Sequence, residues 1–490
     1  MLDRATAYQA LKSRDRRFDG VFYVGVTSTR IYCRPICPVR TPKQENCRFY
    51  ATAEAAEKAA FRPCLRCRPE LAPGLAPVDD AQRIAQLLVQ RIDEGQDETG
   101  GLEQIAAQFH LSSRQLRRIV QQQLGVAPID LLQTRRLLLA KQLLTETQLP
   151  VTDVAYASGF ASLRRFNDAF SKRYRMPPGR LRKQVAARGA AVDAGIDTAA
   201  DTSTLLLGYR PPYDWQGTLA FLRLRVMADV EWVDELAYYR SVALGGQRGW
   251  IGVRHAPERH ALQVQFTHSL TPVLPALLGR LRNLFDLSAR PDLIAGHLAQ
   301  DRYLKREVTA APGLRVPGAF DGFELAVRAI LGQQITVKAA TTLAARFAEC
   351  FGERCVTPLA QLARLSPTPV RVARARVEEI ARLGMPTARA RSIQALAQAC
   401  AAGAVSLEPG TDPARAIAQL VELPGIGPWT AHYIAMRALR WPDAFPHGDV
   451  AVLKALGGMD AAETDRLSQA WRPWRSYAVL HLWRRAARRG

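Results

Sequence analysis

The chain has 490 residues, too many for one hydrophobic core, so we expect about three domains. Its 48% apolar and 8% aromatic residues are typical of soluble globular proteins, and the absence of any apolar run of about 18 residues excludes a membrane-spanning helix. Lys and Arg number 67 against 45 Asp and Glu, and the resulting charge of +22 favours a nucleic-acid partner over solubility alone or a membrane surface. The N-terminus has no signal-peptide pattern, so we expect a cytoplasmic protein.

Two closely spaced cysteine pairs lie near the N-terminus, Cys33 with Cys37 and Cys64 with Cys67. This spacing suits four thiolates around one tetrahedral Zn²⁺, and clustering in a reducing compartment favours a metal over disulfides. We therefore predict a zinc site made of these four cysteines. Cys47 could replace one ligand, although it has no partner at short spacing, and buried cysteines that only pack are the alternative.

The residues around these cysteines form a recognisable pattern. They are Tyr32-Cys33-Arg34-Pro35, Cys37, Phe49-Tyr50, Phe61-Arg62-Pro63-Cys64 and Arg66-Cys67. With this pattern the segment 7–69 resembles the N-terminal domain of the Ada adaptive-response proteins. The resemblance implies that Cys33 accepts a methyl group from a DNA methylphosphotriester, and zinc suits this chemistry because it keeps the thiol ionised. Methylation would remove one negative charge and could switch DNA binding, whereas zinc as a folding element alone is the alternative.

A linker is predicted at 69–77, where Pro and Gly recur, and the chain from 79 to about 183 has the three- and four-residue apolar spacing of helices. Segment 102–118 has the spacing of a helix-turn-helix whose second helix is capped by Ser112 or Ser113. Segment 151–160, followed by Ser162, repeats the arrangement.

The pair of units resembles the AraC-type regulatory domain. That resemblance implies that the second helix of each unit enters the major groove of DNA. The candidate DNA contacts are Ser113, Arg114, Arg117, Arg164 and Arg165, with a solvated helix face as the alternative for each arginine. We expect Phe160, Phe166 and Phe170 in the core.

Residues 186–204 are rich in Ala, Asp, Gly and Thr and are predicted to form a second linker. Between 205 and about 266 we predict a small sheet, because segments 219–226 and 261–266 are compatible with strands. From 272 onward the helical spacing returns, which predicts an α bundle.

A glycine-rich turn, Leu423-Pro-Gly-Ile-Gly-Pro-Trp-Thr430, lies between two predicted helices of this bundle. Gly425 and Gly427 would leave backbone amides exposed at a helix N-terminus, where they can hold a DNA phosphate. Asp449 follows in Pro446-His-Gly-Asp449, at the start of another helix. An Asp there is often only a helix cap, and the turn alone could be an ordinary one, but the two motifs together favour a catalytic acid beside bound DNA.

Further motifs accompany these two: Arg210-Pro-Pro-Tyr-Asp-Trp215, Phe323 with Ala326-Val-Arg-Ala-Ile-Leu-Gly-Gln333, and Trp471-Arg-Pro-Trp-Arg-Ser-Tyr-Ala478 leading to His481-Leu-Trp483. Over about 205–485 the chain resembles the helix-hairpin-helix glycosylases, and more closely the AlkA-type 3-methyladenine DNA glycosylases. The resemblance implies that Asp449 is catalytic and that Trp429, Tyr433 and Trp483 line the pocket for the flipped base. Gln334 stands where the family commonly has an apolar wedge, and either Gln334 or Ile335 could fill the gap in the duplex.

Trp429 occupies the position of the Schiff-base lysine of strand-cleaving relatives, and no cysteine follows Cys400. We therefore expect a monofunctional glycosylase without an iron-sulfur cluster. The expected reaction is hydrolysis of the N-glycosidic bond of alkylated purines.

The predicted fold class is multidomain α+β. Its expected parts are a zinc-binding methyl-acceptor domain (1–76), a double helix-turn-helix domain (79–185), the linker (186–204), an α+β subdomain (205–315) and a helix-hairpin-helix bundle (316–490). The expected partners are double-stranded damaged DNA, promoter DNA and RNA polymerase, which implies association with the nucleoid. Two alternatives are a pure transcription factor with a degenerate glycosylase domain, and a repair enzyme whose N-terminal modules only localise it to DNA.

Overall fold

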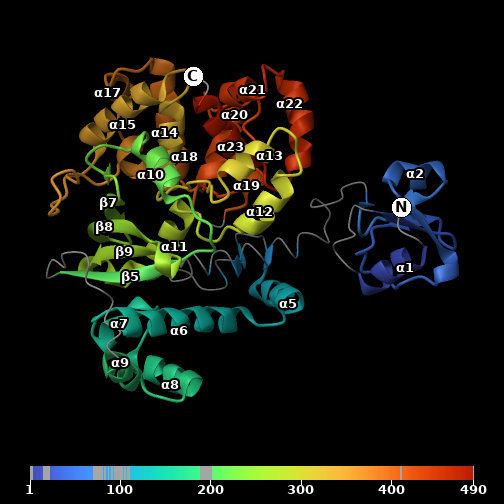
Figure 1. Ribbon diagram of the computed structural model, residues 1–490, viewed down its shortest axis with the longest axis horizontal. Coiled ribbons are helices and arrows are strands. Elements are labelled where there is room, and N and C mark those ends of the chain that lie inside the picture. The colour runs from blue at the N-terminus through green and yellow to red at the C-terminus, as the bar shows by residue number, and fades with distance from the viewer. Residues whose placement is uncertain are drawn as a thin grey trace. The chain divides into compact units, whose positions relative to one another are not determined.

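The computed structural model describes residues 4–14, 22–69, 111–187, 201–408 and 411–488, and a few single positions between 81 and 107. They form two compact units that divide within helix α6, between Leu132 and Gln133, and each unit is described by itself (Figure 1). The predicted linker 69–77 lies outside the described residues except for its first position, and so does 188–200 of the second linker. No helix in the described ranges has the length and apolarity needed to cross a bilayer.

The first unit begins with a small sheet of strand order β3-β1-β2-β4. Its elements are α1 (Arg4–Ser13), β1 (Tyr23–Val26), β2 (Ile31–Cys33), the 3-10 helix η2 (Gln44–Asn46), β3 (Cys47–Tyr50), α2 (Ala53–Lys58) and β4 (Arg62–Pro63). The centre of β1 must be a glycine, because a Cβ at Gly25 would lie 2.9 Å from the rings of Tyr50 and Phe61. The aromatic side chains thus pack directly on the strand backbone.

The next helices are α5 (Ser113–Leu124), α6 (Pro128–Glu146), α7 (Val151–Ala157), α8 (Leu163–Tyr174) and α9 (Pro178–Ala187). Ser112, not Ser113, caps α5: its hydroxyl accepts from the Gln115 amide at 3.2 Å, and the Gln115 side chain accepts from the Ser112 amide at 2.8 Å. Ser162 caps α8 by accepting from the Arg165 amide. Most of the helix expected from residue 102 lies outside the described residues.

Each of the two capped helices buries one apolar stripe and leaves its polar face in solvent. Helix α5 buries Leu116 and Val120, one turn apart. In α8 the buried residues are Phe166 and Phe170, and Phe160 packs against them with a ring distance of 5.3 Å to Phe166. The prediction that these three phenylalanines belong to the core is confirmed.

The second unit contains a five-stranded antiparallel sheet of order β5-β9-β8-β7-β6. Its strands are β5 (Thr202–Gly208), β6 (Glu231–Val233), β7 (Ala237–Leu244), β8 (Gln247–Ala256) and β9 (Ala261–Thr267). The second linker is shorter than predicted, because β5 already begins at Thr202. At this edge strand the backbone N–H and C=O of Leu206 are bound by the side chains of Glu146 (2.8 Å) and Gln142 (2.6 Å).

One predicted strand is wrong: segment 219–226 lies mostly in helix α10 (Trp215–Arg223). Asp214 caps this helix through the Gly217 amide at 2.9 Å. The helix buries Trp215, Leu219 and Leu222, a three- and four-residue spacing that the short alternation after Leu219 conceals. The N-cap Asp214, which lies outside the apolar run, favours a helix over a strand for this segment.

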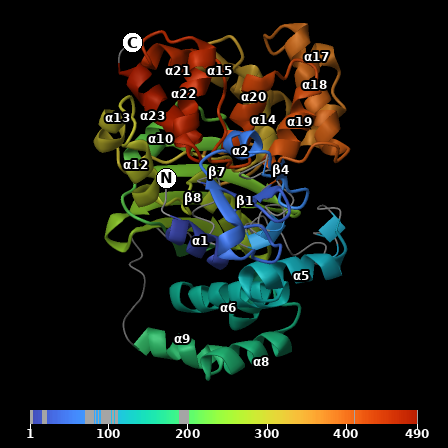
Figure 2. The ribbon, with the colours of Figure 1, turned by 90° about the vertical axis from the view of Figure 1, so that its right-hand side faces the viewer.

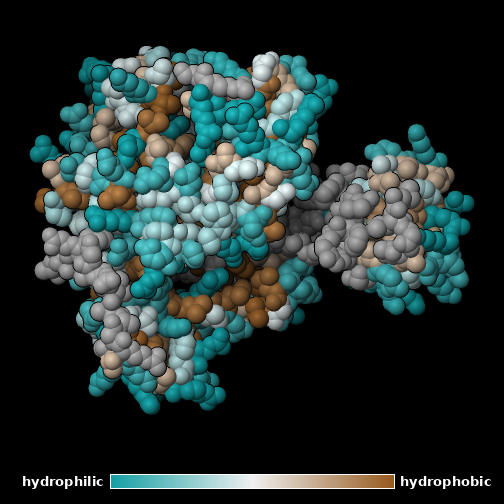
Figure 3. Space-filling model, in the orientation of Figure 1, coloured by the Kyte–Doolittle hydropathy of each residue, from teal (hydrophilic) through white to brown (hydrophobic). Residues whose placement is uncertain are grey.

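Apart from α7, α8 and α9, the helical part of the second unit is made largely of the chain after the sheet, and its helices from residue 322 onward lie on the β7 side of the sheet, away from β5 (Figure 1). Figure 2 shows these helices from a second side. The elements of this part are η5 (Pro257–Arg259), η6 (His268–Val273), α11 (Leu274–Leu284), α12 (Pro291–Leu298), α13 (Lys305–Ala310), α14 (Gly322–Leu331), α15 (Val337–Phe351), α16 (Pro369–Ala373), α17 (Val377–Ala381), α18 (Thr387–Ala401), α19 (Pro413–Val421), α20 (Pro428–Arg437), α21 (Val450–Ala455), α22 (Ala461–Ser468), η7 (Gln469–Trp471) and α23 (Arg475–Ala487). Hydrophilic residues predominate on the face in Figure 3, because the apolar side chains of these helices are turned into the cores.

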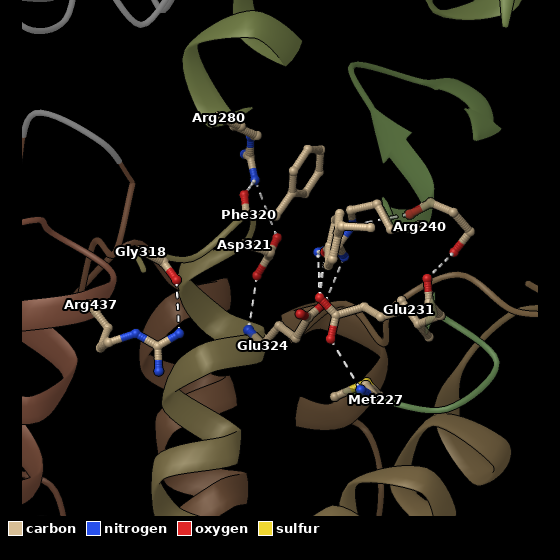
Figure 4. Close-up of polar contacts among 12 residues, drawn as sticks. Met227, Glu231, Arg240, Arg280, Gly318, Phe320, Asp321, Glu324 and Arg437 are labelled. Carbon is tan, nitrogen blue, oxygen red and sulfur yellow. Dashed lines mark hydrogen bonds and ion pairs between the residues drawn. The ribbon is translucent and has the colours of Figure 1, made fainter. Parts of the chain in front are cut away.

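A buried ion cluster joins the sheet to helix α14 (Figure 4). Arg240 on β7 lies 3.4 Å from a carboxylate oxygen of Glu231 and 2.9 Å from one of Glu324, and its guanidinium lies over the ring of Phe320 at 4.2 Å. Burial raises the pKa of Glu324 although Arg240 opposes this shift. Glu324 belongs to α14, the helix that Asp321 caps. The ion pair between Glu324 and Arg240 therefore fixes this helix against the sheet.

We expect Arg240→Met to lower the free energy of unfolding of the second unit by about 3–5 kcal/mol, because two buried carboxylates would lose their counter-charge. Urea unfolding followed by tryptophan fluorescence measures this unit alone, since all eight tryptophans lie between 215 and 483. The matched control is Arg248→Met, which breaks an exposed pair with Glu353 and should cost at most about 1 kcal/mol. Equal shifts for both variants would contradict a structural role for the cluster.

Candidate functional site

The four predicted cysteine ligands come together in the first unit. The Sγ atoms of Cys33, Cys37, Cys64 and Cys67 all lie within 4.8 Å of one another, and all four side chains are buried. Cys47 does not belong to this cluster, because its thiol lies in a separate apolar core and donates to the Lys43 carbonyl. The expected set of four is therefore the set that the fold assembles.

Pairing of two short strands creates this cluster. Strand β2 pairs in parallel with β4, and the Cys64 amide donates to the carbonyl of Tyr32, so Cys33 and Cys64 leave neighbouring strand ends. Cys37 and Cys67 follow in the turns after them. Four thiolates this close to one another repel, so a bound cation would be needed to keep all of them ionised. The donor set fits Zn²⁺, which prefers tetrahedral thiolate sites.

The candidate DNA contacts of the helix-turn-helix units lie at helix starts. Arg114 and Arg117 are exposed on α5, and Ser113 is its first residue. Arg164 and Arg165 are exposed in the first turn of α8. Ser113, Arg114, Arg164 and Arg165 thus lie in the first turn of a helix, and Arg117 lies in the second turn of α5.

The glycine-rich turn forms a hairpin between α19 and α20. Gly425 has φ +76°, and a Cβ there would lie 2.1 Å from the hydroxyl of Ser392, so conformation and space both require glycine. Gly427 caps α20 without a side chain, and both glycines are exposed. The hairpin thus presents the positive end of α20 to solvent, which suits a phosphate.

Asp449 lies near this hairpin and is almost completely buried. Its side chain caps α21, because Oδ1 accepts from the Val452 amide at 3.0 Å. Oδ1 also accepts from the indole N–H of Trp483 at 2.9 Å, and Oδ2 accepts from that of Trp429 at 3.1 Å. Asp449 is therefore more than a helix cap, because the indoles of Trp429 and Trp483 hold its two carboxylate oxygens.

The predicted pocket aromatics lie side by side. Trp429 and Tyr433, one helical turn apart on α20, stack at 5.4 Å with an angle of 8°. The ring of Trp483 lies 6.1 Å from Tyr433. Three rings next to one carboxylate form an electron-rich surface of the kind that binds a cationic or electron-poor base.

Sequence reasoning missed the arginines around Tyr433. Arg437 donates to the Tyr433 hydroxyl at 2.9 Å. It also donates to the carbonyl of Gly318 at 3.0 Å (Figure 4). Burial alone would raise the pKa of Tyr433, but Arg437, Arg225 and Arg328 together lower it. Because the hydroxyl oxygen accepts from Arg437, its own proton remains available to a ligand. The four-residue spacing of Tyr433 and Arg437 on one helix is the signal that could have found this pair.

The turn after α14 carries the candidate wedge. Gln334 is exposed and has φ +58°, a left-handed conformation that is rare for this residue type, whereas Ile335 packs partly against the core. Gln333, which the sequence did not single out, donates to the Gly425 carbonyl at 2.9 Å and to the Thr430 hydroxyl at 3.0 Å. Gln333 therefore ties this turn to the hairpin, with Gln334 at its tip.

Four family models match the chain. They are the metal binding domain of Ada (residues 6–70), a helix-turn-helix domain (105–184), the AlkA N-terminal domain (204–321) and the HhH-GPD superfamily base excision DNA repair protein (327–475). The predicted multidomain α+β class, with its order of parts, is confirmed. The four clustered cysteines all lie within the first of these matches.

Some known proteins are similar to this chain over almost its whole length, and others only over its C-terminal part. A bifunctional transcriptional activator/DNA repair enzyme of Mycobacterium tuberculosis is 37% identical over 490 residues, which cover 98% of this chain and 96% of the relative. DNA-3-methyladenine glycosylase 2 of Escherichia coli is 39% identical over 56% of this chain and 95% of its own length. A solved 3-methyladenine DNA glycosylase of Archaeoglobus fulgidus, at 19% identity, shares the fold over 58% of this chain and 98% of its own, with a TM-score of 0.50.

Proposed function

Because this chain belongs to the family of bifunctional transcriptional activators and DNA repair enzymes that join Ada-type and AlkA-type domains, we propose that it excises alkylated purines such as 3-methyladenine from DNA and regulates transcription in response to alkylation. One observation carries the proposal of excision. Asp449 lies beside the hairpin with both oxygens fixed by the indoles of Trp429 and Trp483. A carboxylate fixed next to stacked aromatic rings is the arrangement that base removal requires.

The proposed site residues have different roles in excision. Gly425 and Gly427 hold a phosphate of the lesion strand, and Gln334 fills the gap in the duplex after the base has flipped. The flipped base, which alkylation makes electron-poor, stacks on the aromatic rings around Tyr433. These contacts select a base by its charge deficit and its planar shape.

Asp449 supplies the negative charge at the reacting sugar. Val452 and Trp483 occupy Oδ1 and Trp429 occupies one lone pair of Oδ2, so the remaining acceptor position on Oδ2 can face the sugar or a water. As the N-glycosidic bond breaks, this carboxylate stabilises the oxocarbenium-like sugar, and water then adds to the anomeric carbon. An alkylated purine leaves easily, so no strong general acid is needed. Trp429 cannot form a Schiff base, which fits hydrolysis without strand cleavage.

The test of excision is the release of free bases from DNA treated with a methylating agent. The full chain should release 3-methyladenine and leave abasic sites without cutting the strand. Release no faster than without protein would instead support a glycosylase-like domain that only binds DNA.

We expect Trp483→Phe to slow this release about 10- to 100-fold, because phenylalanine keeps an aromatic ring but cannot donate to Asp449, and a hydrogen bond to a charged group is worth about 1.5–3 kcal/mol. Trp232→Phe is the matched control, since Trp232 stacks on Tyr239 at 4.9 Å in the sheet and does not contact Asp449. Single-turnover rates of the two variants measure the difference. If both variants kept the wild-type rate, the indole contact would have no part in the reaction.

For the first unit we propose methyl transfer to Cys33 from a DNA methylphosphotriester. A bound zinc ion would keep the four thiols ionised at neutral pH. The Cys33 sulfur attacks the methyl carbon, the new S–C bond replaces the C–O bond, and the phosphotriester becomes an anionic diester. The site thereby loses one negative charge, which favours its contact with DNA phosphates.

Peptide mass mapping tests this transfer. After incubation of the zinc-loaded protein with DNA carrying methylphosphotriesters, one added methyl group is expected on Cys33. If no cysteine gains a methyl group, the zinc would be structural, and excision would be the principal activity.

We further propose that the exposed arginines of α5 and α8 bind promoter DNA and that the bound protein recruits RNA polymerase in the nucleoid. The predicted domains 1–76, 79–185 and 316–490 are proposed to carry these activities, together with the α+β subdomain, which begins at Thr202 with strand β5 and extends to 315. A footprint on promoter DNA before and after methylation would test the regulatory part.

A further inference from the structure

A basic hollow lies on helix α13, outside the residues assigned above. It has a volume of about 490 Å³ and is lined by Arg302, Lys305, Arg306, Thr309 and Ala310, all of which are exposed. The lining thus offers three cations and one hydroxyl group and no carboxylate. Phosphate oxygens are the partners that such a lining suits.

The last turns of α23 extend this charge. Helix α13 packs against α23, and the two helices lie together in Figures 1 and 2. Arg485 donates to the carbonyl of Tyr303 at 3.3 Å, and Arg488 lies 3.7 Å from a carboxylate oxygen of Glu307. Glu307 is buried and already paired, so the surface is dominated by cations. We call the residues Arg302, Lys305, Arg306, Arg485 and Arg488 the basic patch.

Helix α23 carries both a residue of the proposed base pocket and part of the basic patch. Trp483, which binds Asp449, precedes Arg485 by two residues on the same helix. At 1.5 Å per residue, the distance along the axis from Trp483 to Arg488 is about 8 Å. Phosphates follow one another every 3.4 Å or so along one strand of a duplex. From Trp483 to the end of the patch, the chain of α23 therefore spans no more than the length of a few phosphates.

The proposed pocket joins the helix after the hairpin to the helix that carries part of the patch. The ring of Tyr433 lies close to both Trp429, which follows the hairpin, and Trp483, which precedes Arg485 of the patch. A duplex bound to the hairpin with a base in this pocket can thus extend toward the patch.

We propose that the basic patch binds backbone phosphates of the lesion-bearing duplex on one side of the flipped base, and so forms a second anchor in addition to the hairpin. This inference rests on the proposed excision function, because it places the lesion at Asp449. A solvated basic surface without a role is the competing explanation. The proposal and this competing explanation predict different salt dependences for the binding of damaged DNA.

The test compares two triple variants of the full chain. Arg302→Gln/Lys305→Gln/Arg306→Gln removes three cations from the patch. The matched control Arg259→Gln/Arg354→Gln/Arg374→Gln removes three exposed cations elsewhere in the second unit. Affinity for a duplex of about 25 base pairs carrying one abasic-site analogue is measured between about 50 and 200 mM salt.

The patch variant should lower the slope of log affinity against log salt by about 2–3, close to 0.9 for each lost phosphate contact, and the control by less than about 1. Base release at saturating DNA should keep its wild-type rate. Moving the analogue to within two base pairs of either end should weaken wild-type binding more for one end than the other, and the patch variant should lose this asymmetry. Equal slopes for the two variants would overturn the proposal that the basic patch binds DNA phosphates. Absence of base release by the wild-type chain would instead overturn the excision function itself.

Discussion

Asp449→Asn should reduce the release of 3-methyladenine by about 1000-fold or more while the protein still binds damaged DNA. The side chain of asparagine has the same shape, but it carries no charge and has an N–H₂ group in place of one oxygen. One of the two indoles, Trp429 or Trp483, would then face a donor instead of an acceptor. Loss of a preorganised charge at the reacting centre typically costs about 100- to 1000-fold, and the misdirected indole adds to this loss. Single-turnover release and affinity for an abasic-site duplex measure the two parts separately.

The control for this variant is Asp460→Asn. Asp460 also caps a helix, since it accepts from the Glu463 amide at 2.7 Å, but no indole contacts it. It should therefore cost a little stability and leave base release unchanged. Retained excision by Asp449→Asn, or equal losses for both variants, would refute the assignment of Asp449 as the catalytic carboxylate.

The parts of this molecule that were predicted from sequence depend on residues close together in the chain. The cysteine pairs are each within one turn, so their spacing alone indicates a metal site. The hairpin is also a local motif, in which Gly425 needs a conformation that only glycine adopts easily. The geometry of such local features can be predicted from the spacing and type of neighbouring residues.

The parts that sequence reasoning missed depend on contacts between distant segments or on ambiguous periodicity. The position of Asp449 between two tryptophans joins residues from three helices, which no spacing encodes. The same holds for Gln333, whose amide reaches the hairpin across 92 positions of the chain. The sequence of segment 219–226 predicts a strand because a short apolar run fits both the strand and the helix period, and the helix cap Asp214 lies outside the run.

Removal of zinc should unfold the zinc-binding part of the first unit, which ends at residue 69, and leave the second unit intact. Fewer than 70 residues surround the four cysteines, so the small apolar cores there cannot supply much stability, whereas a structural zinc site contributes about 10–16 kcal/mol in isolated zinc-binding peptides. A chelator should release one zinc per chain and expose Cys47, which is buried in the core beside the sheet. Thiol labelling of Cys47 therefore measures unfolding of this part. Tryptophan fluorescence, which arises only from the second unit, should not change.

Variants of single cysteines separate the metal from the methyl acceptor. Cys37→Ala removes one of the four ligands and should lose zinc, whereas Cys47→Ala removes a buried thiol outside the cluster and should keep it. Cys33→Ala should lose both zinc affinity and methyl uptake, and it should leave base release at the wild-type rate because Asp449 belongs to the other unit. If Cys33→Ala impaired excision as strongly as Asp449→Asn, the two activities could not be independent. The intact rate would show instead that one chain carries two separable responses to the same kind of damage.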